Sequence, residues 1–306
     1  MPDVRRRSSA LGLGLTVLVA VLVSAFFVAA AKTAGTETAS ITFVRGPDYA
    51  QSIYLVSFDG RHVSRLLRDG HYSTCAQDFE CPGDLSYSDP AWSSDGRLAA
   101  SVSTEPDQGN SQTCVAVFTQ KPHTRAVRCD LVSEPSWAPD GRHLALACDC
   151  LTNFLPLLTV WRIGSLQIDL PTLVRTGHFD PKPAWSPDGS RIAFARGWGA
   201  SPRLYLIRPD GSGAKELLTS SANNASWSPD SRRLVFDNGH RIAVINADGT
   251  GLRYLTNSKT GDTDPAWSPD GRWIAFVRHG DLWLMDANGA SQRLLVRNAT
   301  QPAWKP

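Results

Sequence analysis

Charged residues recur at two fixed places in the sequence, and both places could bind a polar ligand. An acid or a lysine precedes the tripeptide P-A-W or P-S-W at Asp89, Glu134, Lys182 and Asp264. An arginine ends an apolar run of the form I-x-F-x-R at Arg45, Arg196 and Arg278. If these groups gather at the mouth of one channel in the folded protein, they would bind a polar peptide or a sugar. If they pair with one another instead, they would join neighbouring structural elements.

Three residues outside those places are further candidates for contact or ligation. Trp198, in the segment R-G-W-G, is a candidate partner contact because aromatic residues are enriched among binding hot spots; the alternative is a loop packed on its own element. His71 and His178 each follow a glycine, at equivalent positions in two repeated segments described below. They are the candidate ligands if a metal binds. The alternative is that both are solvated loop residues, and we predict no cofactor and no metal.

No catalytic motif accompanies these candidates. The sequence contains no G-x-S-x-G, no H-E-x-x-H and no P-loop. The net charge is only +2, and part of it comes from Arg5, Arg6 and Arg7, so a basic surface for nucleic acid is not indicated. These observations favour a binding protein that catalyses no reaction and binds no nucleic acid.

The sequence motif around these tripeptides, called the tryptophan phrase below, is repeated along the chain. It reads DPAWSSDGR (89–97), EPSWAPDGR (134–142), KPAWSPDGS (182–190), NASWSPDSR (224–232), DPAWSPDGR (264–272) and QPAWKP (301–306). Its tryptophans lie 37 to 48 residues apart, at Trp92, Trp137, Trp185, Trp227, Trp267 and Trp304. This period is typical of a four-stranded propeller blade. Each unit offers a first strand, a P-D-G turn and three further apolar or alternating runs, such as 192–196, 203–209 and 215–219.

The two ends of the chain complete each other. ITFVRG (41–46) matches the second run of a unit with no first strand before it, and QPAWKP supplies a first strand with nothing after it. Joined, they form one blade, which closes the ring and removes its free edges. The sequence therefore predicts an all-β, six-bladed β-propeller over residues 41–306.

The repeat resembles that of the TolB-type β-propellers, a WD40-like family whose core reads P-x-W-S-P-D-G followed by I-A-F. The match is weaker in the second and third units, around SSDGRLAAS and FLPLLTVWRIGS. The resemblance implies a structural role for the repeated tryptophans and an envelope protein that binds a protein or peptide. We expect no counterpart of the α/β domain that precedes the propeller in TolB. The alternatives are a propeller-type polysaccharide lyase or hydrolase and a carbohydrate-binding ectodomain.

The N-terminal segment predicts export. Residues 1–10 form a basic n-region, and residues 11–31 carry no charge. A helix of this length spans a bilayer, whereas Ala29 to Ala31 also resemble a signal-peptidase site. The segment is thus either a membrane anchor or a signal peptide cleaved near Ala31. Both interpretations place residues 41–306 outside the cytoplasm, with residues 32–40 as a linker. We expect the protein to be a monomer.

The cysteines suit an exported chain, because disulfides persist in oxidising compartments. There are six. Cys75 and Cys81 bracket a short loop, and Cys114 and Cys129 would face each other if the segment between them is a hairpin. Cys148 and Cys150 are only two residues apart, so a bridge between them requires a distorted backbone.

Overall fold

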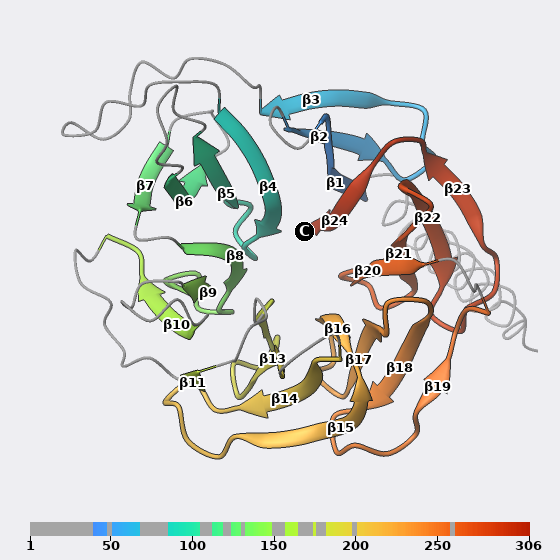
Figure 1. The fold of residues 1–306 in the computed structure, drawn as a ribbon. Helices are drawn as coiled ribbons and strands as arrows, with labels where there is room; N and C mark the ends of the chain where they lie inside the picture. Colours follow the sequence, from blue (N-terminus) through green and yellow to red (C-terminus); the bar gives the residue numbers. More distant parts are fainter. Residues whose placement is uncertain are drawn as a thin grey trace, which may run out of the picture. The chain divides into compact units, whose positions relative to one another are not determined.

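The propeller consists of six four-stranded antiparallel sheets arranged as blades around a central axis (Figure 1). In this computed structural model the described residues are 39–47, 51–67, 85–104, 112–118, 124–129, 132–148, 157–164, 174–175, 182–197, 201–257 and 261–306. All of them except Ala39 belong to one compact unit, which runs from Ser40 to Pro306. The predicted six-bladed architecture is confirmed.

Each blade is numbered here by its order along the chain and given from its inner strand outward. Blade 1 is β24 (Thr300–Lys305), β1 (Ser40–Arg45), β2 (Ser52–Ser57) and β3 (Val63–Leu67). Blade 2 is β4 (Leu85–Trp92), β5 (Leu98–Thr104), β6 (Gln112–Phe118) and β7 (Thr124–Cys129). Blade 3 is β8 (Val132–Trp137), β9 (His143–Cys148), β10 (Leu157–Arg162) and β11 (Val174–Arg175).

The last three blades follow the same order. Blade 4 is β12 (Ala184–Trp185), β13 (Ile192–Arg196), β14 (Arg203–Ile207) and β15 (Lys215–Ser221). Blade 5 is β16 (Asn223–Trp227), β17 (Arg233–Asp237), β18 (Ile242–Asn246) and β19 (Arg253–Tyr254). Blade 6 is β20 (Asp262–Trp267), β21 (Trp273–Arg278), β22 (Asp281–Asp286) and β23 (Arg293–Val296).

Blade 1 is shared between the two ends of the described unit, as the repeat predicts. Strand β24 pairs antiparallel with β1, with Trp304 opposite Ile41. The Thr42 hydroxyl donates a hydrogen bond to the carbonyl of Ala303 at 2.9 Å. Because this pairing joins residues from the two ends of the described unit, it closes the ring of blades.

In blades 2, 4, 5 and 6 the turn after the inner strand is built by a serine and an aspartate, whereas blade 3 has Ala138 in place of the serine. In blade 4, the Ser186 hydroxyl donates to the Asp188 carboxylate at 2.6 Å, and the Gly189 amide donates to the Ser186 carbonyl at 2.9 Å. Gly189 has a φ of 75°, a conformation that favours glycine. The matching turn of blade 2 is one residue shorter. The Ser93 amide donates to the carbonyl of Arg97, four positions on, whereas the Ser186 amide of blade 4 donates to the carbonyl of Arg191, five positions on.

The hydrophobic core lies between blades. The second strands are buried, and Ile274, Ala275 and Phe276 of β21 have no exposed surface. One buried cluster joins Leu204 and Leu206 of blade 4 to Trp227 and Phe236 of blade 5. Each blade therefore buries its apolar face only by packing against its neighbour, which makes the closure of the ring important for stability.

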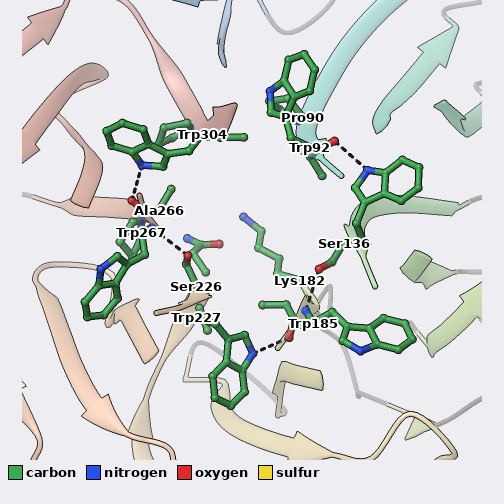
Figure 2. Close-up of a pocket in the computed structure, with 18 of the residues that line it drawn as sticks. Pro90, Trp92, Ser136, Lys182, Trp185, Ser226, Trp227, Ala266, Trp267 and Trp304 are labelled. Carbon is green, nitrogen blue, oxygen red and sulfur yellow. Dashed lines mark hydrogen bonds between the residues drawn. The ribbon is translucent and has the colours of Figure 1, made fainter. Parts of the chain in front are cut away.

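The residue before each repeated tryptophan takes part in the bonds between neighbouring blades. Where it is alanine in blades 2, 4 and 6, the tryptophan indole of the next blade donates to its carbonyl, from Trp137 to Ala91, from Trp227 to Ala184 and from Trp304 to Ala266. After Ala303 of blade 1, the Trp92 indole donates instead to the Thr42 hydroxyl at 3.1 Å. Where it is serine, its hydroxyl accepts a hydrogen bond from the backbone amide of the next blade's tryptophan. Ser136 accepts from Trp185, and Ser226 accepts from Trp267 (Figure 2). The repeated tryptophans thus lie at the contacts between blades.

A guanidinium group covers several of these tryptophans from the preceding blade. Arg233 lies 4.9 Å from the ring centre of Trp267. We expect Arg233→Met to lower the free energy of unfolding by about 0.5–1 kcal/mol, because the cation–π contact is lost while the aliphatic packing stays. Chemical denaturation followed by circular dichroism measures this. The exposed neighbour Arg232, changed to methionine, is the control, and an equal loss in both variants would contradict the prediction.

Several predictions fall wholly or partly outside the described residues. These are the n-region, the anchor or signal peptide and nearly all of the linker, together with Trp198, His71, His178, Cys75, Cys81 and Cys150. Within the described ranges, no helix has the length and apolar character needed to span a bilayer. Cys114 and Cys148 are each disulfide-bonded, and the β6–β7 register places Cys129 opposite Cys114. This register suits the Cys114–Cys129 bridge, which stays a prediction.

Candidate functional site: a polar ring around a central cavity

One residue of each blade stands just before the tryptophan tripeptide and adopts a left-handed backbone conformation. The φ angles lie between 37° and 53° for these six residues, called the ring residues below: Asp89, Glu134, Lys182, Asn224, Asp264 and Gln301. Aspartate and asparagine tolerate this conformation, but glutamate, lysine and glutamine adopt it rarely. Its recurrence in every blade shows that it belongs to the repeat, and strained backbone of this kind is often found at functional sites.

The ring residues line a single cavity of about 420 Å³. The rest of the cavity wall consists of prolines such as Pro90 and Pro265, small residues such as Ala266, and the six repeated tryptophans (Figure 2). The volume lies in the range of ligand pockets, and the wall combines apolar surface with a few polar groups at fixed places.

Hydrogen bonds between neighbouring blades hold the ring residues in place. The Asp89 amide donates to the side chain of Gln301 at 2.8 Å, and the Lys182 amide donates to the Glu134 carboxylate at 2.9 Å. The backbone amides of Glu134 and Asp264 donate instead to side chains on the second strand of the preceding blade. The Glu134 amide donates to the Ser101 hydroxyl at 3.0 Å, and the Asp264 amide donates to the Asp237 carboxylate at 3.2 Å. A ring fixed by such bonds is preorganised for a ligand.

The charges in the cavity wall are unbalanced. Three carboxylates and one ammonium line it, from Asp89, Glu134, Asp264 and Lys182. Burial alone would lower the pKa of Lys182, but the attraction of Asp264, Glu134, Asp89 and Asp237 outweighs it and raises that pKa. Burial raises the pKa of Asp264, against the attraction of Lys182. The cavity is therefore electronegative although it contains a lysine.

Comparison with known proteins agrees with this fold and repeat. Residues 84–306 match the model of the TolB beta propeller domain. The chain belongs to the TolB β-propeller family. It is 30% identical over 125 residues, 41% of its length, to the Tol-Pal system protein TolB of Anaeromyxobacter dehalogenans. That match spans only 25% of the relative, so the chain aligns with about a quarter of the curated protein it resembles.

Solved structures show the same fold. TolB from Acinetobacter baumannii superposes with a TM-score of 0.69 at 17% identity, covering 89% of this chain and 67% of that one. A chain of the nidogen/laminin complex gives a TM-score of 0.66 at 12% identity, covering 88% and 98%. At these identities the likeness concerns the fold alone.

A second acid lies directly behind the ring of this TolB-family propeller. Asp237 at the end of β17 is 1% exposed, and its carboxylate accepts hydrogen bonds from the Asn224 side chain at 2.7 Å and the Gly239 amide at 3.0 Å. Burial raises the pKa of Asp237 to about 6, and the charge of Asp264 adds to the shift. The equivalent residues of blades 1, 4 and 6 are apolar: Val44, Ala195 and Val277.

The three arginines of the sequence prediction do not line the described cavity wall. Arg45 donates to the carbonyls of Arg297 and Asn298 and lies over the rings of Phe43 and Tyr54. The structure therefore separates them from the acids and Lys182, which it does bring together.

The other two arginines also contact their own blades. Arg278 forms a two-pronged ion pair with the buried Asp262, at 2.7 and 2.8 Å, and Arg196 lies 5.6 Å from the ring centre of Tyr205. The expectation that the arginines share the channel mouth with the acids does not hold for this cavity.

Sequence reasoning missed two of the six ring residues. Asn224 and Gln301 occupy the same place in the repeat as Asp89, but they were overlooked because they carry no charge. Alignment of the repeats by their tryptophans would have found both. Within the described part of the chain, no group of three or more histidines, cysteines or acids has the arrangement of a metal site.

Proposed function

We propose that this TolB-family propeller acts outside the cytoplasm as a non-catalytic scaffold that binds an envelope protein, and that a segment of the partner enters the ring cavity. The observation that carries the proposal is the cavity itself, with its fixed ring of Asp89, Glu134, Lys182, Asn224, Asp264 and Gln301. An apolar wall with a ring of polar groups suits a protein segment, because the apolar wall supplies contact area and the polar groups supply specificity.

Two further observations support a place at the envelope. The relative from Anaeromyxobacter dehalogenans is named as a protein of the Tol-Pal system. The uncharged segment 11–31 follows three arginines, which suits an exported chain held by an anchor or released after cleavage. We propose that residues 1–10 remain on the cytoplasmic side.

A capture experiment with two matched variants tests the proposal. The full chain is produced in a bacterial host, its distribution between membrane and soluble fractions is recorded, and it is immobilised for capture from envelope extracts. The ring variant combines Asp89→Asn, Glu134→Gln, Lys182→Met and Asp264→Asn, which removes every charge of the cavity wall whatever its sign. The control variant combines Asp59→Asn, Asp210→Asn and Asp248→Asn, three exposed acids of outer turns.

We expect the wild type and the control to retain the same partner and the ring variant to lose at least tenfold in affinity. The partner is identified by mass spectrometry and its binding repeated with the purified protein. Thermal melts confirm that all three chains fold. A partner retained equally by the ring variant would place the binding surface elsewhere, and no partner for any chain would remove the support for a scaffold function.

A further inference from the structure

The ring cavity holds a cation of its own. Lys182 is the one cationic side chain among the residues that line the described cavity, and Figure 2 shows it extending inward from blade 4. Its ammonium nitrogen lies 4.0 Å from a carboxylate oxygen of Asp264, which belongs to blade 6. Because blade 5 lies between those two blades, the contact reaches across part of the cavity.

This internal ion pair is loose. A separation of 4.0 Å exceeds that of a charge-assisted hydrogen bond, and the side chains are 40% and 24% exposed for Lys182 and Asp264. The lysine has a flexible four-carbon stem, so its ammonium can leave Asp264 without any change in the backbone. An incoming group can therefore take its place beside the carboxylate.

The charge of the wall indicates which group that is. With three carboxyl groups against one amine, the lining residues carry a formal charge of −2 when all four are ionised. A cation entering the cavity reduces this excess, whereas an anion increases it. Water is partly excluded from such a site, so the sign of the charge matters more there than on the open surface.

We propose that the ring cavity binds a lysine or arginine side chain of its protein partner, and that Lys182 is a tethered competitor for the same carboxylates. The proposal rests on the proposed function, since it names the chemistry of the partner segment. In the empty cavity Lys182 partly neutralises Asp264. When the partner binds, its cation takes that place and the Lys182 ammonium turns away, which lowers the affinity and sharpens the requirement for a well-fitting segment.

The test measures binding of two short probes to the full chain. Hexalysine and hexaglutamate are titrated while the intrinsic fluorescence of the tryptophans in the cavity wall is followed, with calorimetry as a second readout. We expect hexalysine to bind the wild type, Lys182→Met to bind it about tenfold more tightly, and Asp264→Asn about tenfold more weakly. Added salt should weaken binding in each case. Lys182→Gln is a second variant in case methionine disturbs folding.

The matched control is Lys215→Met, which removes an exposed lysine of β15 and should leave hexalysine binding within twofold of the wild type. Unchanged or weaker hexalysine binding by both Lys182 variants would overturn the proposal. So would binding of hexaglutamate that depends on Lys182, because the cavity would then take an anion. In either case the captured partner could still depend on the ring variant, so the proposed function would stand while this inference fails.

Discussion

Replacing Trp304 with alanine is expected to lower the free energy of unfolding by about 3–5 kcal/mol, the range for a buried large aromatic side chain. Trp304 lies in β24, is 7% exposed and contacts the Phe58 ring of the same blade. Its indole donates a hydrogen bond to the Ala266 carbonyl of blade 6 at 2.9 Å. The substitution therefore opens a cavity and removes a bond between blades at the place where the ring is closed.

The position in the chain adds to the effect. Strand β24 is held to β1 by pairing between the two ends of the propeller, so weakening it exposes the apolar faces of blades 6 and 2 together. Equilibrium denaturation followed by circular dichroism gives the change in stability. Lys305→Ala in the same strand is the control, because it loses only the contact between its ammonium and the Trp92 ring, about 1 kcal/mol at most. Equal losses in the two variants would show that β24 is not required for closure.

Much of this fold could be predicted because each repeat unit contains the residues that form its own strands and turns. The tryptophan phrase and the apolar run that follows it are both read from neighbouring residues, and the phrase occurs six times, so it predicts six blades. The shared blade followed from the same logic, since 41–46 and 301–306 are two parts of one unit. The occurrence of alanine or serine before each tryptophan is equally visible in the sequence, but its consequence depends on which carbonyl faces which blade.

The position of the arginines outside the described cavity wall has a physical reason. In a strand, side chains two residues apart share a face, so Arg45 lies on the same face as Phe43, and Arg278 on the same face as Phe276. The facing third strand places Tyr54 opposite Phe43 and Trp283 opposite Phe276. The guanidinium groups therefore stack on these aromatic pairs instead of reaching the axis. Period-two reasoning would have predicted this.

Asp237 could not have been selected from the sequence. It ends an apolar run at a place where four of the other blades have valine or alanine and blade 2 has Ser101, and nothing nearby marks it as part of a site. Its importance comes from contacts across blades, with Asn224 of its own blade and the amide of Asp264 in the next. The carboxylate fixes two ring residues at once, which only the folded ring reveals.

Protonation of Asp237 should make the stability of the propeller depend on pH in an unusual direction. The native pKa is about 6, above the ordinary value of 3.8, because burial disfavours the charged form. Between pH 4 and pH 6 the native state then binds more protons at this site than the unfolded state does. The contribution of Asp237 to stability is therefore complete below about pH 4 and is lost as the pH rises through about 6.

The difference between the wild type and Asp237→Asn isolates this contribution, since the other titrating groups are common to both. We expect the free energy of unfolding of the wild type, relative to the variant, to be higher at pH 4 than at pH 7 by on the order of 2–3 kcal/mol. Asp248→Asn is the control, because hydrogen bonds from Thr250 lower the pKa of that exposed acid and its effect has the opposite sign.

Denaturant titrations at half-unit steps of pH supply the data. A difference that stays constant with pH, or that grows toward pH 7, would show that the Asp237 carboxyl ionises as an ordinary acid. A slope between pH 4 and pH 6 would instead show that burial governs its protonation. Because its carboxylate oxygens hold both Asn224 and the Asp264 amide, proton uptake there would also loosen the ring, and binding to the cavity should weaken over the same interval.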